Sequence, residues 1–288
     1  MSLTIAEAVR EAAEALGAAG VEEARREAGS LAGFVTGRDR TFLLTHDDAR
    51  LSARELARLR AAVERRAAGE PLQYITGRQE FYGLEFEVTP DVLIPRPETE
   101  LLVETALGLL RGTPAPLVCD VGTGSGCVAV SLLHERRDAR AYALDISQPA
   151  LRVAARNAAR HGVSERFTPL LSDCFDRLRC GPETPPRFDA ILSNPPYVAE
   201  DELATLQREV REHEPRQALT PGGDGLSVIR RLVAEAPEFL KPGGRLLFEI
   251  GFGQHESVRA LVDPRVWTLL AVREDLQGIP RTFALGLA

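Results

Sequence analysis

The chain has 288 residues, of which 44% are hydrophobic and 27% are charged, and its formal net charge is −7. This length and composition are typical of a globular protein with one large domain or two domains of unequal size. The negative charge argues against broad, sequence-independent binding to DNA or RNA. The chain has no apolar run of about 18 residues that could span a membrane, and its first residues do not have the pattern of a signal peptide.

Cysteine usage indicates a reduced environment. The chain has four cysteines, Cys119, Cys127, Cys174 and Cys180, and none forms a C-x-x-C pair or clusters with histidine at zinc spacing. Three of them lie in or beside apolar runs, where a free cysteine behaves as a small buried hydrophobic residue. We therefore expect a cytoplasmic protein without disulfides or a bound metal.

Residues 1–71 predict a small helical domain. Thr4 with Glu7, and Ser52 with Glu55, each fit a capping box in front of an amphipathic stretch. This segment carries no set of residues with catalytic spacing. We expect it to orient a partner substrate or to pack on the domain that follows.

Residues 72–97 predict a linker. From Gln79 to Thr89, apolar and polar residues alternate around Gly83, a pattern typical of a short β-hairpin. Ile94-Pro-Arg-Pro97 then favours an extended segment, because each proline fixes its own φ and restricts the residue before it. The linker is therefore expected to be partly rigid.

Residues 98–288 alternate between short apolar runs and helical stretches. Runs of strand length occur at 117–121, 141–145, 188–193 and 245–250, and helical segments near 126–136, 148–161 and 225–240 separate them. This alternation predicts an α/β fold with a mostly parallel sheet covered on both faces. Residues 267–274 and 282–287 are expected to form a terminal hairpin-like pair.

A glycine-rich loop follows the first of these runs and begins a helix. Its candidate ligand-binding residues are Asp120, Gly122, Thr123, Gly124, Ser125 and Gly126. Glycines let the backbone turn sharply and approach a ligand closely, beside the exposed N–H groups of a helix N-terminus. Asp145 ends the next run, where a carboxylate can accept hydrogen bonds from ribose hydroxyls. The combination predicts a site for a nucleoside cofactor, with a helix cap or a surface acid as the alternative for Asp145.

Two cofactor classes compete for this loop. A nicotinamide dinucleotide site needs G-x-G-x-x-G, and Cys127 occupies the place of the third glycine. The spacing G-x-G-x-G instead resembles motif I of the S-adenosylmethionine-dependent methyltransferases. Asp173, which follows the apolar stretch 167–171, lies where that class contacts the adenine. An ordinary loop carboxylate is the alternative for Asp173.

A proline-rich motif, Ser193-Asn-Pro-Pro-Tyr197, follows the third apolar run, at the strand end where open α/β sheets bind ligands. Asn194 can accept a hydrogen bond through its amide oxygen and donate through its nitrogen. Pro195 and Pro196 lack N–H groups, so they present carbonyl oxygens from a backbone of fixed φ. Tyr197 supplies an aromatic face against a planar group.

These residues suit an acceptor that is a planar amino group. Such a nitrogen has a delocalised lone pair, and it becomes tetrahedral and positively charged as a methyl group is transferred to it. Two oxygens that accept from its two N–H bonds would align it and stabilise that charge. This chemistry requires no general base with a shifted pKa. A proline-rich turn with a capping asparagine is the structural alternative.

The chain resembles the HemK-like family of protein-glutamine N5-methyltransferases, which act on peptide-chain release factors. The motifs that carry the resemblance occur in the family's order over nearly the whole chain: Arg78-Gln-Glu-Phe-Tyr-Gly83, Leu93-Ile-Pro-Arg-Pro-Glu-Thr-Glu100, Asp120-Val-Gly-Thr-Gly-Ser-Gly126, Ser193-Asn-Pro-Pro-Tyr197, Glu214-Pro215 with Gly222-Gly-Asp-Gly225, and Asp275-Leu-Gln-Gly-Ile-Pro-Arg281. The resemblance implies a helical N-terminal domain, a hairpin linker and a seven-stranded, Rossmann-like class I methyltransferase domain.

The resemblance also implies site residues. It assigns S-adenosylmethionine, and the product S-adenosylhomocysteine, to the loop Asp120–Gly126, Asp145, Asp173, Cys174 and Asn194. It makes Asn194–Tyr197 the catalytic motif that binds the substrate glutamine. Phe81 falls where the family uses an aromatic residue near that glutamine, with a hairpin core residue as the alternative. Cys174 stands where some members carry tryptophan, so a stacking contact there is not implied.

Other functions compete with this interpretation. The Asn-Pro-Pro-Tyr motif also occurs in methyltransferases of exocyclic amines in nucleic acids, such as N6-adenine enzymes, but the charge of −7 and the lack of a basic target-recognition insert argue against them. A sister group methylates glutamine in a ribosomal protein, yet residues 94–100 look more like the release-factor branch. A non-catalytic, S-adenosylmethionine-binding assembly factor would not need an acceptor motif. We therefore expect a monomeric enzyme that binds a release factor and neither nucleic acid directly nor a membrane.

Overall fold

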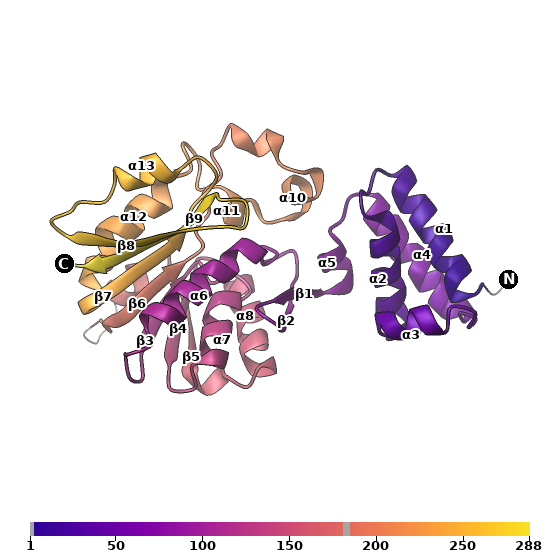
Figure 1. Ribbon diagram of the computed structural model, residues 1–288, viewed down its shortest axis with the longest axis horizontal. Helices are drawn as coiled ribbons and strands as arrows, with labels where there is room; N and C mark the ends of the chain where they lie inside the picture. The colour runs from indigo at the N-terminus through magenta and orange to yellow at the C-terminus, as the bar shows by residue number, and fades with distance from the viewer. Residues whose placement is uncertain (1–2, 181–184) are drawn as a thin grey trace. The chain divides into compact units, whose positions relative to one another are not determined.

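The structure, a computed structural model, describes residues 3–180 and 185–288 of the chain. It divides into two compact units, which can be followed in Figure 1. The first contains Met1–Arg78 and Gln207–His213, and the second contains Gln79–Leu206 and Glu214–Ala288. The glycine loop and the Asn-Pro-Pro-Tyr motif both belong to the second unit.

The first unit is built from helices. They are α1 (Ile5–Ala18), α2 (Ala24–Thr36), α3 (Arg40–Thr45), α4 (Ala53–Ala67), α5 (Leu72–Thr76) and α10 (Arg208–His213). Both predicted capping boxes are confirmed. The hydroxyls of Thr4 and Ser52 accept from backbone N–H groups in the first turns of α1 and α4, and the glutamates at Glu7 and Glu55 accept in return from the cap residues. Apolar residues of α1, α2 and α4 form the core of this unit.

A buried arginine joins α10 to this unit. Arg66 of α4 is only 8% exposed. Its guanidinium pairs with Glu27 of α2 at 2.5 Å and with Glu209 of α10 at 2.7 Å. The two carboxylates offset the cost of burying this charge. Residues 207–213 therefore group with the helical unit, although they lie within the 98–288 segment of the sequence.

The predicted hairpin is confirmed, with β1 (Arg78–Phe81) paired to β2 (Leu84–Glu87). Its two-residue turn is Tyr82-Gly83, with φ values of 54° and 70°. Positive φ at both positions is typical of the turns whose twist matches that of the flanking strands. Phe81 and Phe86 are buried and contact each other edge to face, so the hairpin contributes to the core of the second unit.

The second unit contains a seven-stranded sheet in the order β5-β4-β3-β6-β7-β9-β8. Its strands are β3 (Leu117–Val121), β4 (Arg140–Asp145), β5 (Phe167–Leu171), β6 (Phe188–Ser193), β7 (Leu240–Glu249), β8 (Trp267–Glu274) and β9 (Pro280–Leu287). β5, β4, β3, β6 and β7 run parallel, whereas β9 pairs antiparallel with both β7 and β8. The mostly parallel sheet and the terminal pair of strands are therefore confirmed.

Helices cover both faces of this sheet (Figure 1). They are α6 (Glu100–Leu109), α7 (Cys127–Glu135), α8 (Gln148–Arg160), α9 (Asp176–Arg179), α12 (Ser227–Glu235) and α13 (His255–Arg259). The unit also contains α11 (Arg216–Leu219) and 3₁₀ turns at Pro97–Thr99, Ser164–Arg166, Glu202–Thr205 and Ala236–Glu238. Neighbouring residues of one strand point to opposite faces. Val118 accordingly packs in the cluster that contains α6, α7 and α8, and Cys119 packs in the cluster that contains α12.

The strand order determines where a site can form. β3 lies between β4 and β6, so the chain runs outward from β3 to β5 and then returns to the other side of β3. At such a reversal, the loops after the two adjacent strands leave in opposite directions and open a crevice at their carboxyl ends. The glycine loop follows β3 and the Asn-Pro-Pro-Tyr motif follows β6. The two predicted parts of the site therefore meet at this crevice.

Candidate active site

A cavity of about 440 Å³ lies at the carboxyl ends of the parallel strands. Sites for small molecules and cofactors commonly enclose about 300–1,000 Å³. The predicted site residues that line it are Asp120, Gly122, Thr123, Gly124, Ser125, Asp145, Asp173, Cys174, Asn194, Pro195 and Pro196. Gly126, Tyr197 and Phe81, which the structure also describes, lie outside this lining.

Backbone hydrogen bonds to β4 hold the glycine loop. The N–H groups of Gly122 and Thr123 both donate to the carbonyl of Leu144, at 2.8 and 2.9 Å. Gly126 has a φ of 82°, and a Cβ there would lie 3.1 Å from the Cβ of Ala154 in α8. Any other residue at Gly126 would be strained in its backbone and would push α7 away from α8.

Two carboxylates line the cavity beside this loop. Asp145 accepts from the N–H groups of Gly124 and Ser147, each at 2.8 Å. Ser147, and not Asp145, caps α8 with its side chain, which leaves the capping alternative for Asp145 without support. Asp120 is 1% exposed and accepts from the Thr123 hydroxyl at 2.7 Å. Burial raises the pKa of Asp120 to about 7, and burial also raises the pKa of Asp145.

A buried asparagine connects the loop to the hairpin. The amide nitrogen of Asn157 in α8 donates to the carbonyls of Ser125 at 2.8 Å and Glu87 at 3.0 Å, and its oxygen accepts from the N–H of Glu87 at 2.8 Å. These partners lie 32 and 70 positions away in the sequence. No local pattern marks Asn157, which is why the sequence analysis did not single it out.

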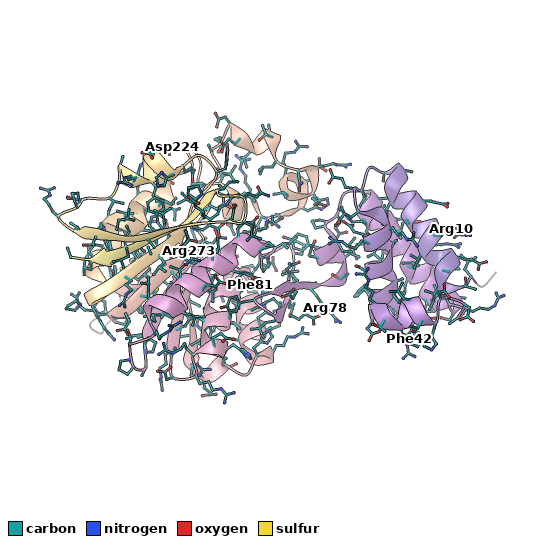
Figure 2. The ribbon with its side chains drawn as sticks, viewed as in Figure 1. Arg10, Phe42, Arg78, Phe81, Asp224 and Arg273 are labelled. Atoms are coloured by element: carbon teal, nitrogen blue, oxygen red, sulfur yellow. The ribbon has the colours of Figure 1, made fainter. Side chains whose placement is uncertain are left out.

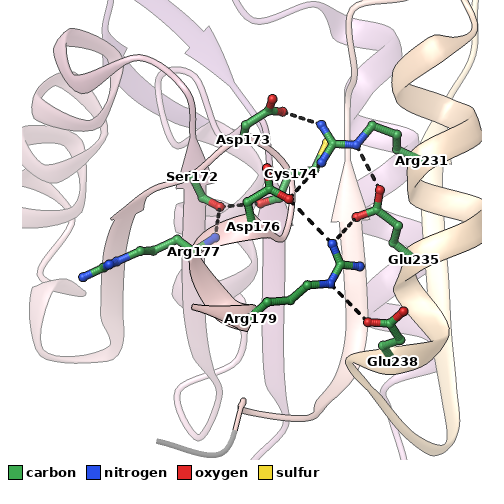
Figure 3. Close-up of polar contacts among 9 residues, drawn as sticks. All are labelled: Ser172, Asp173, Cys174, Asp176, Arg177, Arg179, Arg231, Glu235 and Glu238. Carbon is green, nitrogen blue, oxygen red and sulfur yellow. Dashed lines mark hydrogen bonds and ion pairs between the residues drawn. The ribbon is translucent and has the colours of Figure 1, made fainter. Parts of the chain in front are cut away.

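The adenine side of the predicted site contains an arginine from another helix (Figure 3). Arg231 of α12 pairs with Asp173 at 2.7 Å and with Glu235 at 3.0 Å. The Asp173 side chain is 54% exposed, so the ion pair leaves much of it open to the cavity. Cys174 is buried, and burial raises the pKa of its thiol to about 11. The thiol is therefore protonated at neutral pH and presents a small apolar surface rather than a nucleophile.

The Asn-Pro-Pro-Tyr motif is anchored to the end of β3. The hydroxyl of Ser193, the last residue of β6, donates to the carbonyl of Val121 at 2.7 Å. Asn194 donates through Nδ2 to the hydroxyl of Thr99 at 2.9 Å, and Asn194, Pro195 and Pro196 all line the cavity. These contacts place the motif directly opposite the glycine loop.

A buried glutamate holds both ends of this motif. Glu249, the last residue of β7, is 1% exposed. Its carboxylate accepts from the Thr99 hydroxyl at 2.6 Å and from the Tyr197 hydroxyl at 3.1 Å. Burial raises the pKa of Glu249 to about 7, and the two hydroxyl donors oppose that rise. Glu249 could not be predicted from the sequence, because a single acid at the end of an apolar strand has no distinguishing pattern.

Two further segments that carry family motifs contact the segments that form the site. Glu214 is buried and accepts from the N–H of Ile94 at 3.1 Å, and it also pairs with Arg96. Gly225 has a φ of 77°, and a Cβ there would lie 2.3 Å from the carbonyl oxygen of Tyr197. Only glycine fits at this approach.

Phe81 lies in the apolar core rather than in the cavity wall. It is 1% exposed and contacts Phe86 with ring centroids 6.1 Å apart (the residue is labelled in Figure 2). This position favours the hairpin-core role that the sequence left open as the alternative.

Within residues 3–180 and 185–288, no group of three or more His, Cys, Asp and Glu side chains is arranged to hold a metal ion. Over the same ranges, no helix has the length and apolarity needed to cross a bilayer.

The sheet order, the glycine loop after β3 and the acid at the end of β4 define the second unit as a class I methyltransferase domain, the class that uses S-adenosylmethionine. The solved structure of the hMettl16 catalytic domain, in complex with the MAT2A 3′UTR hairpin 6, is similar with a TM-score of 0.52 and 16% sequence identity. The match covers 79% of this chain and 81% of that one, and it shows the fold alone.

Sequence relatives identify the family. The PrmC N-terminal domain matches residues 7–77, and the methyltransferase small domain matches residues 98–230. The chain is 46% identical over 276 residues to the release factor glutamine methyltransferase of Cereibacter sphaeroides, covering 96% of each. It is 49% identical over 251 residues to the protein of that name from Burkholderia pseudomallei, covering 85% of this chain and 86% of the relative. The chain belongs to the release factor glutamine methyltransferase family, and the resemblance inferred from its motifs is confirmed.

The lining of the cavity fits S-adenosylmethionine. The loop at Gly124 has open space where a Cβ would stand, so a ligand can approach its backbone closely. Asp145 lines the cavity with a carboxylate, a group of the kind that can accept from ribose hydroxyls. Ile146 also lines the cavity and is 60% exposed, which provides an apolar surface for a planar base beside the Asp173 carboxylate. Ile146 was not among the residues predicted from the sequence.

Proposed function

We propose that this protein methylates the side-chain amide nitrogen of the glutamine in the Gly-Gly-Gln motif of a peptide-chain release factor. Membership of the family supports a release factor as the substrate, because relatives of that name align along nearly the full chain. The assignment of an amide as the methyl acceptor is supported by the position of Asn194, Pro195 and Pro196 in the wall of the cavity, opposite the glycine loop.

The proposal assigns a role to each part of the chain. Residues 1–71 orient the protein substrate, residues 72–97 form the linker, and residues 98–288 carry out methyl transfer. The proposed cofactor residues are Asp120, Gly122, Thr123, Gly124, Ser125, Gly126, Asp145, Asp173, Cys174 and Asn194. The proposed acceptor residues are Asn194, Pro195, Pro196 and Tyr197.

The chemistry needs orientation and charge stabilisation more than proton transfer. S-adenosylmethionine supplies a methyl group whose carbon bonds to the acceptor nitrogen as the carbon–sulfur bond breaks and sulfur keeps the electron pair. The nitrogen becomes positively charged and then releases one proton to water. The amide oxygen of Asn194 and the carbonyl oxygen of Pro195 accept from its two N–H bonds, which aligns the lone pair and stabilises the charge. The proline rings present no N–H donors that would compete for these oxygens.

The test is mass spectrometry after incubation with labelled S-adenosylmethionine and three alternative acceptors: intact release factor, a peptide containing its Gly-Gly-Gln loop, and duplex DNA. We expect the label on the glutamine side-chain nitrogen. Intact release factor should react far faster than the peptide, because contacts remote from the amide orient it. DNA should give no product. Methylated adenine in DNA with unmodified release factor would refute the proposal.

The proposal also covers the state of the enzyme and the kind of partner that it binds. The net charge of −7 supports a protein substrate over direct nucleic-acid binding, and we propose a monomeric, cytoplasmic enzyme. A ribosomal-protein glutamine substrate is the second candidate, since it presents the same amide. Purified ribosomal proteins in the same assay distinguish the two candidate substrates, because we expect release factor and not a ribosomal protein to be labelled at a high rate.

A further inference from the structure

Three distant chain segments hold the acceptor motif. Asn194 follows β6, Thr99 ends the 3₁₀ turn before α6, and Glu249 ends β7. A hydrogen bond of 2.9 Å connects Asn194 to Thr99, over 95 positions of the sequence, and one of 2.6 Å connects Thr99 to Glu249, over 150 positions. Thr99 and Glu249 are each 1% exposed, so water competes little for these bonds.

The carboxylate of Glu249 determines the direction of the two hydrogen bonds that connect it through Thr99 to Asn194. Above its pKa of about 7, Glu249 is an ionised carboxylate, which can only accept. The Thr99 hydroxyl therefore donates its single proton to Glu249, and towards Asn194 it can only accept. The amide nitrogen of Asn194, and not its oxygen, must then face Thr99. The oxygen is left on the other side of the planar amide, and it has no hydrogen-bond donor among the residues that the structure describes.

We propose that Thr99 and Glu249 are positioning residues for methyl transfer, which fix the side-chain amide of Asn194 so that its oxygen faces the acceptor nitrogen. The inference rests on the proposed function and extends it. A half-turn of the Asn194 amide would present an NH₂ group to the N–H bonds of the acceptor. One of the two accepting oxygens would then be lost.

Other contacts keep these two residues in place. Glu249 accepts from Tyr197 through its second oxygen, so one carboxylate holds the first and the last residue of the Asn-Pro-Pro-Tyr motif. The backbone carbonyl of Tyr197 accepts from the side chain of Gln254 at 2.8 Å. The segment that carries Thr99 is anchored a few residues earlier, where the N–H of Ile94 donates to Glu214. The amide of Asn194 is therefore oriented by a rigid framework.

The first test replaces the hydroxyl of Thr99. Thr99→Val has nearly the same shape but neither accepts from Asn194 nor donates to Glu249. We expect kcat on release factor to fall by about 10- to 100-fold, less than the loss of Asn194 itself, with S-adenosylmethionine affinity unchanged within about twofold. Thr99→Ser restores the hydroxyl and should recover most of the rate. Thr105→Val is the matched control: Thr105 is also buried, but its hydroxyl donates only to Leu101 of its own helix.

The second test uses pH. The charged groups that act on Glu249 are Arg281 of β9, which favours its ionised form, and Glu98, which opposes it. Below its pKa of about 7, the carboxyl can donate a proton to Thr99 and release the constraint on Asn194. The kcat of the wild-type protein should therefore rise with pH through about 7. The Glu249→Gln variant, whose side chain does not titrate, should have a lower kcat that does not rise with pH in this range. If kcat of this variant still rises, the pH dependence belongs to another group.

The third test does not depend on activity. The side-chain NH₂ resonances of Asn194, assigned by their loss in Asn194→Asp, should show slow hydrogen exchange in the wild-type protein and fast exchange in Thr99→Val. If release factor is not a substrate, the exchange difference still tests the positioning role, so the two failures can be told apart. Wild-type kcat and wild-type exchange in Thr99→Val would overturn the inference. An equal loss of kcat and cofactor affinity would also overturn it, because Thr99 would then act on cofactor binding.

Discussion

The two halves of the candidate site are built in different ways. On the cofactor side, the glycine loop is held mainly by backbone groups and by carboxylates close in sequence: Asp120 bonds to Thr123 three positions later, and Asp145 bonds to Gly124 over 21 positions. On the acceptor side, the bonds that hold Asn194 run between side chains, from Asn194 to Thr99 and from Thr99 to Glu249, over 95 and 150 positions. The first half depends mainly on the backbone of one loop, and the second depends on side chains that the sheet brings together.

This difference has a physical consequence. A turn that depends on backbone N–H groups and positive φ needs glycine at particular places, so a short motif specifies it. An acceptor site made from side chains depends on which strands are neighbours, because strand order brings the ends of β6 and β7 together. Substitutions in the two halves should therefore separate cofactor binding from turnover.

Asn194→Ala should show the largest effect and the clearest separation. The substitution removes one preorganised oxygen that stabilises charge in the transition state, so turnover on release factor should fall by about 10²–10³. Affinity for S-adenosylmethionine, measured by calorimetry, should stay close to that of the wild-type protein, because the other proposed cofactor residues are unchanged and the oxygen of Asn194 faces the acceptor. Near-normal turnover would show that Asn194 is only a structural cap, and the distinction between the two halves would fail.

Gly225→Ala tests whether the loop at 222–225 sets the geometry of the acceptor side. Its Cβ would meet the Tyr197 carbonyl at 2.3 Å, so the motif must move. A displacement of about 1 Å can reduce a rate by about 10²-fold, and we expect a loss of that order in kcat with cofactor affinity retained.

Gly223→Ala is the control for this loop. Gly223 also has a positive φ, of 58°, but a Cβ there meets nothing within 4 Å. Measurements of turnover and of thermal unfolding for both variants distinguish the clash with the Tyr197 carbonyl from backbone strain. Equal losses of turnover in the two variants would assign the effect to strain alone.

Asp145→Ala probes the cofactor side. It removes one or two charge-assisted hydrogen bonds to the ribose, each worth about 1.5–3 kcal/mol. Affinity for S-adenosylmethionine should therefore fall at least about tenfold by calorimetry, while circular dichroism shows a folded protein. An unchanged dissociation constant would contradict the ribose assignment.

The smallest effect concerns stability and pH, and it compares one buried carboxyl from each half. Burial raises the pKa of both Asp120 and Glu249 to about 7, above their ordinary values near 4 in the unfolded chain. Their contribution to the free energy of unfolding is present below pH about 4 and is lost as pH rises through about 7. Urea unfolding should therefore show lower stability at pH about 8 than at pH about 5.

Substitutions assign the slope to these two groups, because Asp145, whose pKa burial also raises, adds to it in the same direction. Carboxylates such as Asp138 and Asp224, whose pKa is lowered to about 2 by arginine partners, stay ionised throughout and add no slope. Asp120→Asn and Glu249→Gln should each flatten the dependence. Higher stability at pH about 8 than at pH about 5 would reverse the predicted sign.

Much of the fold could be predicted from the sequence because its signals are local. The capping boxes at Thr4 and Ser52 involve residues three positions apart, and both are present. The expected strand at 117–121 matches β3 residue for residue, because a buried parallel strand requires a continuous apolar run. The grouping of 207–213 with the helical unit could not be predicted, since it depends on Arg66 and Glu209, which are far apart in the chain.

The sequence by itself determined the class of fold, the family and the two motifs that line the cavity. These features follow from residue types at short spacing, where backbone geometry and periodicity act directly. Only the tertiary structure decided which side chains complete the motifs. Asn157 bonds to the glycine loop, Arg231 pairs with Asp173, and Glu249 holds Asn194 through Thr99. Hydrogen bonds between distant residues leave no local pattern, because they form only after the order of the strands has brought their ends together.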